Sequence, residues 1–184
     1  MAQRWIVTAL GQDRPGIVAG VTKVLYGLGC NLEDSAMRRL EGEFTIMLIF
    51  SSPARVNEAA LRTRFEPLAR QFKLSIHLKR LSATESRAPR KQGRTYLISV
   101  YGADRPGIVF RVSDALARIG VNITDVHTHR SAGGGRAAPS LYLLLLEVEI
   151  PKRLAISSVE EQLKRIAKQL HVELSLRPSE TDIL

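Results

Sequence analysis

A nine-residue segment occurs twice in this chain of 184 residues, and the two copies start 91 residues apart. Residues 10–18 are LGQDRPGIV, and residues 101–109 are YGADRPGIV. A glycine, an asparagine and an aspartate follow each copy at the same spacing (Gly29, Asn31 and Asp34; Gly120, Asn122 and Asp125). Similarity that recurs at one fixed offset indicates an internal duplication, so the chain contains one module twice.

The duplication predicts two small domains. We expect module 1 at residues 1–84, a basic linker at residues 85–94 and module 2 at residues 95–184. Domains of this size bury only about 60–65% of the surface that their unfolded chain exposes. Each module therefore gains stability by packing against its twin or another chain, and we expect a homo-oligomer.

The net charge of +9 is unevenly distributed. Residues 1–94 contain 16 Lys/Arg against 8 Asp/Glu, whereas residues 95–184 contain 11 against 10. A solvated basic surface with a basic linker explains this excess. Direct nucleic-acid binding by module 1 is the alternative, although no helix-turn-helix, zinc-knuckle or RNP signature accompanies it. The basic residues at the linker are Arg87, Arg90, Lys91 and Arg94.

The single cysteine, Cys30, excludes a disulfide framework and fits a reducing cytoplasm. We interpret it as a small buried hydrophobic residue and not as a nucleophile. Residues 1–10 lack the apolar core and cleavage site of a signal peptide. The longest apolar run, residues 141–146, is too short to span a bilayer. We therefore expect a cytoplasmic protein with no membrane partner.

Each copy of the repeated segment lies between a predicted strand and a predicted helix. Residues 4–10 form a short β-branched and apolar run that predicts a strand. Apolar residues then recur at helical spacing, after a proline and before a glycine that stops the helix. The two helical stripes are Ile17, Val18, Val21, Val24, Leu25 and Leu28, and Ile108, Val109, Val112, Ala115, Leu116 and Ile119.

Two strands and a second helix follow in each module. Residues 31–40 and 44–50 predict paired strands in module 1, whereas a glycine-rich segment, residues 131–139, precedes the strand at 141–150 in module 2. Pro67 lies inside the second helical stripe of module 1, so we expect a kink or break there. The second helix of module 2 begins with a predicted capping box, formed by Ser157 or Ser158 with Glu160 or Glu161.

A final alternating strand (Leu74, Ile76 and Leu78; Val172, Leu174 and Leu176) completes each module. The order β-α-β-β-α-β predicts an α+β, ferredoxin-like fold with two helices on one face of a four-stranded antiparallel sheet. The first and third strands should be central. The third strand of module 1 has apolar residues on both faces, so we expect the twin module or a second subunit to cover the face without helices.

The corner between the first strand and first helix suggests binding chemistry. The start of a helix carries unpaired N–H groups and positive potential, which favour a carboxylate or phosphate. Gly16 and Gly107 allow close approach to the backbone. Asp13 and Asp104 could cap the helix or could receive a ligand ammonium group. A free amino acid offers both charges, whereas a capped helix start without a ligand is the plainer alternative.

The Asp-Arg-Pro-Gly-Ile-Val corner and the Gly-x-Asn-(Leu/Ile)-x-x-Asp segment resemble those of ACT domains, the ferredoxin-like regulatory modules that bind amino acids. The similarity covers nearly the whole chain and is greatest to the family of glycine cleavage system transcriptional repressors. The same corner precedes a catalytic domain in formyltetrahydrofolate deformylase and some phosphoserine phosphatases. Here no residues are left for such a domain.

The resemblance implies ligands at module–module interfaces, between one corner and the start of a partner's second strand. The longer glycine-rich segment of module 2 departs from the tight turn of module 1, which puts symmetrical binding in question. The implied ligand-binding residues are Asp13, Arg14, Pro15, Gly16, Ile17, Asn31 and Leu32 in module 1 and Asp104, Arg105, Pro106, Gly107, Ile108, Asn122 and Ile123 in module 2.

By this resemblance, the expected protein is a non-enzymatic regulator without a cofactor, which binds a small amino acid such as glycine or serine. It would repress transcription through a DNA-binding partner, by ligand-dependent interfaces. No credible catalytic triad, carboxylate pair or zinc spacing supports an enzyme. The alternatives are an interaction module without a ligand and the direct nucleic-acid binding considered above.

Three residues of module 2 could instead bind a metal ion. Asp125, His127 and His129 alternate and therefore share one face of a strand. The equivalent residues of module 1 are Asp34, Ala36 and Arg38, so the duplication does not support a shared metal site. We expect surface or interface histidines, which would make assembly sensitive to pH.

Overall fold

The computed structural model describes residues 2–82, 93–131 and 140–179. Contacts between residues divide the chain into two compact units, Met1–Ala88 and Pro89–Leu184. Of the predicted linker, residues 85–92 lie outside the described residues, as does most of the glycine-rich segment. Gly93 and Arg94 were predicted to belong to the linker, but they are the first residues of a strand.

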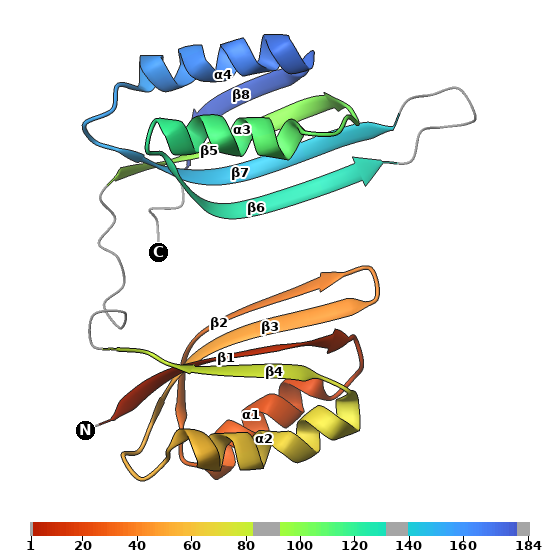
Figure 1. Cartoon of the computed structure of the whole chain (residues 1–184), viewed down its shortest axis with the longest axis vertical. Coiled ribbons are helices and arrows are strands. Elements are labelled where there is room, and N and C mark those ends of the chain that lie inside the picture. Colours follow the sequence, from red (N-terminus) through yellow and green to blue (C-terminus); the bar gives the residue numbers. More distant parts are fainter. Residues whose placement is uncertain (1, 83–92, 132–139, 180–184) are drawn as a thin grey trace. The chain divides into compact units, whose positions relative to one another are not determined.

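The two units have the same order of elements (Figure 1). Unit 1 consists of β1 (Gln3–Gln12), α1 (Ile17–Gly27), β2 (Asn31–Leu40), β3 (Glu43–Ser52), α2 (Glu58–Phe72) and β4 (Ser75–Arg80). Unit 2 consists of β5 (Gly93–Ala103), α3 (Ile108–Arg118), β6 (Asn122–Ser131), β7 (Leu141–Pro151), α4 (Ile156–Leu170) and β8 (Glu173–Pro178).

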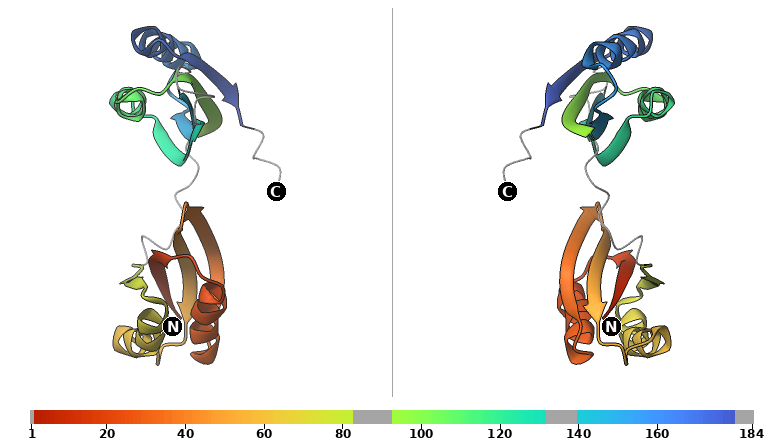
Figure 2. Two further views of the ribbon diagram at one scale, coloured as in Figure 1. Left: turned by 90° about the vertical axis from the view of Figure 1, so that its right-hand side faces the viewer. Right: turned by 90° about the vertical axis from the view of Figure 1, so that its left-hand side faces the viewer.

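Each unit forms one four-stranded antiparallel sheet, in the orders β2-β3-β1-β4 and β6-β7-β5-β8. The first and third strands are central, as predicted. Figure 1 shows α1 and α2 together on one face of the first sheet. Figure 2 shows α3 and α4 together on one face of the second sheet. The predicted ferredoxin-like βαββαβ fold is confirmed in both units.

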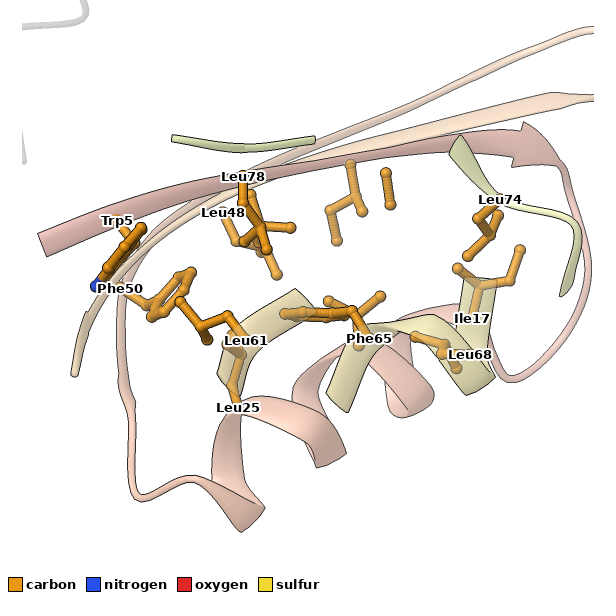
Figure 3. Close-up of a cluster of buried hydrophobic side chains, with 14 of the residues drawn as sticks. Trp5, Ile17, Leu25, Leu48, Phe50, Leu61, Phe65, Leu68, Leu74 and Leu78 are labelled. Carbon is orange, nitrogen blue, oxygen red and sulfur yellow. The ribbon is translucent and has the colours of Figure 1, made fainter. Parts of the chain in front are cut away.

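The core of unit 1 lies between its sheet and its two helices (Figure 3). Alternate residues of β1 and β3 are buried against the helices, as the period of two in a strand requires. Trp5 is 2% exposed, and its indole N–H donates to the Ser52 hydroxyl over 3.1 Å. This bond satisfies the one buried polar side chain of the described residues.

The opposite face of the first sheet has no helix. Met47 of β3 is 46% exposed and Ile49 is half-buried, whereas their neighbours Ile46 and Leu48 are buried on the helix face. Every residue of the edge strand β2 is exposed. The prediction of a third strand with two apolar faces is therefore confirmed.

Two local predictions about the helices are wrong, and a third is wrong in part. Of the kink or break expected at Pro67, the break does not occur: α2 continues through this residue, and Phe65 and Leu68 on its two sides are buried in the core. The α4 helix has Ala155 at its N-cap and no side-chain capping bond, so the capping box does not form.

The buried stripe of the first helix in each unit is also narrower than the apolar stripe predicted from the sequence. Val18 and Val109 are 42% and 39% exposed, because they follow the buried Ile17 and Ile108 by 100° around the helix. Within the described ranges, no helix is long and apolar enough to cross a bilayer.

Candidate ligand-binding corners

The same backbone corner occurs in both units at the start of the first helix. Gly16 is the N-cap of α1, with a φ of 97°, and Gly107 is the N-cap of α3, with a φ of 92°. Residues with a Cβ rarely adopt this left-handed conformation, which explains the glycine of the repeated segment. Neither N-cap makes a side-chain capping bond. The first N–H groups of both helices therefore lack a side-chain cap and are available to an anion.

The other glycine of each corner is required by packing. A Cβ on Gly11 would lie 2.9 Å from Leu74 Cδ2, and one on Gly102 would lie 2.8 Å from Val172 Cγ1. These contacts are too short for carbon atoms, so the chain that enters the last strand packs directly on the backbone of the first. The repeated Gly-x-Asp-Arg-Pro-Gly pattern thus fixes both the path and the conformation of the corner.

An ion pair that the sequence analysis missed ties each corner to the second strand. Asp13 Oδ2 lies 3.4 Å from Arg39 Nη1, and Asp104 Oδ2 lies 3.5 Å from Arg130 Nη1. Arg39 and Arg130 are 91 residues apart, so the repeat itself contained the signal. These aspartates do not cap the helices, and that alternative is wrong.

The backbone of each corner aspartate also bonds to the chain between the second and third strands. The N–H of Asp13 donates to the carbonyl of Gly42, and the N–H of Asp104 donates to the carbonyl of Ser140, both over 2.9 Å. The carboxylate is thus held by its backbone next to the helix start. Its side chain is partly accessible, at 34% in Asp13 and 29% in Asp104.

The remaining corner residues divide into core and surface. Ile17 and Ile108 are buried and anchor the helix start, whereas both prolines are exposed. The Arg14 guanidinium donates to Gln12 Oε1 over 2.9 Å. Among the described residues, neither Arg14 nor Arg105 forms an ion pair.

The other half of the predicted site lies at the opposite end of each sheet. Asn31 pairs with Ser51, beside the start of β1, whereas the corner follows the end of β1. Asn122 pairs with Glu149 at the equivalent end of the second sheet. Leu32 and Ile123 follow these asparagines, so they too are distant from the corner of their own unit. One unit therefore does not bring the two predicted halves together.

A β-bulge explains the second repeated segment. The pairing register shifts between Leu32 and Asp34 in β2, and between Ile123 and Asp125 in β6. After the bulge, the aspartate accepts a bond from the next backbone N–H, over 2.7 Å in unit 1 and 2.8 Å in unit 2. The Gly-x-Asn-(Leu/Ile)-x-x-Asp pattern thus places the same irregularity in the edge strand of each unit.

The structure also places the histidines of module 2 and the single cysteine that the sequence analysis considered. His127 Nε2 lies 2.7 Å from Asp125 Oδ2 on the exposed strand β6. Over residues 2–82, 93–131 and 140–179, no group of three or more His, Cys, Asp and Glu side chains is arranged to hold a metal ion. Cys30 is half-buried against the core of unit 1, and this burial raises the pKa of its thiol.

Each corner therefore combines a helix start that lacks a side-chain cap with the carboxylate of the aspartate that precedes it, Asp13 or Asp104. The fold and these corners define a small α+β module that occurs twice in the chain. The chain belongs to the ACT domain family, whose model matches residues 3–79 and 94–177.

The comparisons also identify similar proteins over nearly the full length. The chain is 27% identical to the glycine cleavage system transcriptional repressor of Escherichia coli (strain K12) over 93% of this chain and 87% of that protein. The crystal structure of an unknown protein from Galdieria sulphuraria has a TM-score of 0.83 and 27% identity, covering 97% of this chain and 99% of the other. A candidate glycine cleavage system transcriptional repressor shares the fold, with a TM-score of 0.66, 22% identity and coverages of 96% and 97%.

Proposed function

We propose that this chain is a non-enzymatic regulatory protein that binds a small amino acid, such as glycine or serine, at its two corners. The observation that carries the proposal is the duplicated corner, in which a glycine N-cap leaves the helix start uncapped beside a fixed aspartate. The helix start would bind the ligand carboxylate. Asp13 or Asp104 would bind its ammonium group.

Both corners are candidates because both have the same geometry. The glycine φ angles differ by 5°, and the two Asp–Arg distances differ by 0.1 Å. A ligand ammonium group would compete with Arg39 or Arg130 for the carboxylate. Binding would thereby release an arginine of the edge strand, which gives ligand occupancy a direct effect on an exposed strand. The asparagines at the opposite end of the sheet would come from another module of the same kind.

We infer a role in transcription from similarity to the Escherichia coli repressor over 93% of the chain. The protein would act in the cytoplasm, in keeping with its single, unpaired cysteine. It would act through a DNA-binding partner protein, as a ligand-dependent homo-oligomer. Regulation requires that the amino acid bind one assembly or complex more tightly than another.

A thermal-shift screen against all twenty amino acids tests the proposal. A ligand present at about 100 times its Kd stabilises the folded chain by about 2.7 kcal/mol. We expect one or two amino acids to raise the Tm, and we expect the Asp13→Asn/Asp104→Asn double variant to lose this shift. Glu58→Gln/Glu66→Gln is the matched control, because it removes two exposed carboxylates of α2 that lie outside the corners and outside the second strand. A flat screen at millimolar ligand would refute the proposal.

A further inference from the structure

A groove runs between α1 and α2 on the surface of unit 1. Its volume is about 560 Å³, within the range of about 300–1,000 Å³ that is typical of small-molecule pockets. Val24, Leu68 and Phe72 contribute apolar surface to it, and the 85% exposed Tyr26 stands at its side. The groove therefore offers an apolar surface of ligand size, which adjoins the proposed corner at Gly16 but extends away from it along the two helices.

Gly20 makes the close approach of these helices possible. A Cβ at this position would overlap the Leu68 side chain, so α1 presents bare backbone to α2. Gly27 also lines the groove, and a Cβ there would meet nothing within 4 Å. The hollow forms because two residues of α1 that line it, Gly20 and Gly27, have no side chain.

The charged residues that line the groove are both cationic. Lys23 and Arg64 are exposed, and neither forms an ion pair with any described residue. No carboxylate lines the groove. By contrast, Arg62 and Arg70 of the same helix α2 are each paired with a glutamate four residues earlier, both at 2.6 Å. The groove thus keeps two unneutralised positive charges over apolar surface.

The equivalent groove of unit 2 lacks this character. It lies between α3 and α4 and also has a volume of about 560 Å³. Arg111 occupies the position of Gly20, and Asp114 occupies that of Lys23. Asp114 Oδ2 forms an ion pair with Arg118 Nε at 2.9 Å, within the groove lining. The duplicated grooves have therefore diverged. Among the described residues, the groove of unit 2 holds one unpaired cation, Arg111, beside the Asp114–Arg118 pair, whereas the groove of unit 1 holds two unpaired cations and no carboxylate.

We propose that the α1–α2 groove binds a small amphiphilic anion. Its carboxylate or sulfonate would lie between Lys23 and Arg64, and its apolar body would lie against Val24, Leu68 and Phe72. Charge-assisted bonds to the anion and burial of apolar surface both favour this ligand class. The inference goes beyond the proposed function, since Asp13 does not line the groove and the two unpaired cations occur only in the groove of unit 1, although Gly16 adjoins both sites.

The probe for this site is 8-anilinonaphthalene-1-sulfonate, an apolar aromatic anion whose fluorescence reports binding. The full chain is titrated as the wild type and as two double variants. Lys23→Ala/Arg64→Ala removes the two groove cations. Arg62→Ala/Arg70→Ala is the matched control, since it removes two positive charges from α2 outside this groove.

We expect Lys23→Ala/Arg64→Ala to weaken binding about tenfold, the effect of losing one or two charge-assisted contacts, whereas the control should change affinity less than twofold. The neutral analogue N-phenyl-1-naphthylamine should bind all three proteins equally. Decanoate should displace the sulfonate probe, and decanol should not. In ¹H–¹⁵N spectra, the probe should shift the amide signals of Gly20 and Gly27.

Equal weakening by the two double variants would overturn the proposal, because binding would then follow net charge alone. Unchanged affinity of Lys23→Ala/Arg64→Ala, or failure of decanoate to compete, would also overturn it. The amino-acid thermal shift of Lys23→Ala/Arg64→Ala should equal that of the wild type, so failure of this proposal and failure of the corner sites are distinguishable.

Discussion

At the scale of single residues, the corner depends on backbone conformation more than on side-chain bonds. Gly16 has a φ of 97°, and an L-residue in the left-handed region costs about 1–2 kcal/mol. We expect Gly16→Ala to lower the free energy of unfolding of unit 1 by about this amount. The measurement is urea unfolding followed through Trp5, the single tryptophan, which is buried in unit 1.

Gly42→Ala is the matched control for this variant. Gly42 lies in the same unit, has no positive φ, and a Cβ there would meet nothing within 4 Å. Its stability should therefore change by less than about 0.5 kcal/mol. Equal effects of the two substitutions would show that the backbone of the corner is not the source of the strain.

The corner aspartate should contribute little to stability. The Asp13–Arg39 pair is 3.4 Å long and largely exposed, and such surface pairs contribute about 0–1 kcal/mol. We expect Asp13→Asn to leave the midpoint of urea unfolding nearly unchanged, which makes this variant suitable for binding studies. A loss of several kcal/mol would assign the aspartate a structural role instead.

At the scale of elements, Pro67 removes one backbone hydrogen bond from the interior of α2. It lies in the interior of the helix and has no N–H to donate to the carbonyl of Thr63. Pro67 is exposed, so its replacement creates no core cavity. We expect Pro67→Ala to stabilise unit 1 by about 1–3 kcal/mol, measured through Trp5 fluorescence in urea. Gln71→Ala, on the exposed surface of the same helix, should have an effect near zero, and destabilisation by Pro67→Ala would contradict this account.

The start of α4 offers a second test at this scale. Ala155 is a poor N-cap residue, yet its φ of −69° and ψ of 131° are those of a normal N-cap. We expect Ala155→Ser to raise the free energy of unfolding of unit 2 by about 1 kcal/mol, because its hydroxyl can accept a bond from the first turn.

Far-UV circular dichroism during urea unfolding measures this gain. Ser157→Ala is the matched control, and it should not destabilise unit 2, because Ser157 is not the capping residue. If Ser157→Ala instead lowered the free energy of unfolding by about 1 kcal/mol, Ser157 would be a capping residue, as the predicted capping box requires.

The sequence predicted the elements well because periodicity determines them. Residues 31–40 form β2 within the predicted bounds, and the buried positions of α1 are members of its apolar stripe. Pro67 and the Ser–Glu pairs misled the local prediction, since core burial and the real helix start decide these positions. Local patterns alone do not contain that tertiary information.

At the scale of the whole molecule, the duplication is the strongest guide to function. The uncapped helix start, the Asp–Arg pair and the edge-strand bulge occur in both units. Among the described residues, a groove between the two helices that is lined by cations and no carboxylate occurs in unit 1 only. Shared features point to the common function of the module, and divergent features point to what each unit does by itself.

The candidate site was less predictable than the fold. The repeated letters located the corner, but the Asp–Arg pair depends on side-chain placement across two strands. Asn31 and Asn122 were grouped with the corners by resemblance, and each lies at the far end of its own sheet. Strand direction decides this separation, and it becomes visible only when the sheet is assembled.

Titration calorimetry of the amino acid that raises the Tm tests the central claim most directly. We expect the full chain to bind it at both corners, Asp13→Asn and Asp104→Asn each to remove one of the two sites, and the double variant to release no heat of binding. Unchanged binding by the double variant would contradict the account, because the ligand would then be held by residues outside the two corners.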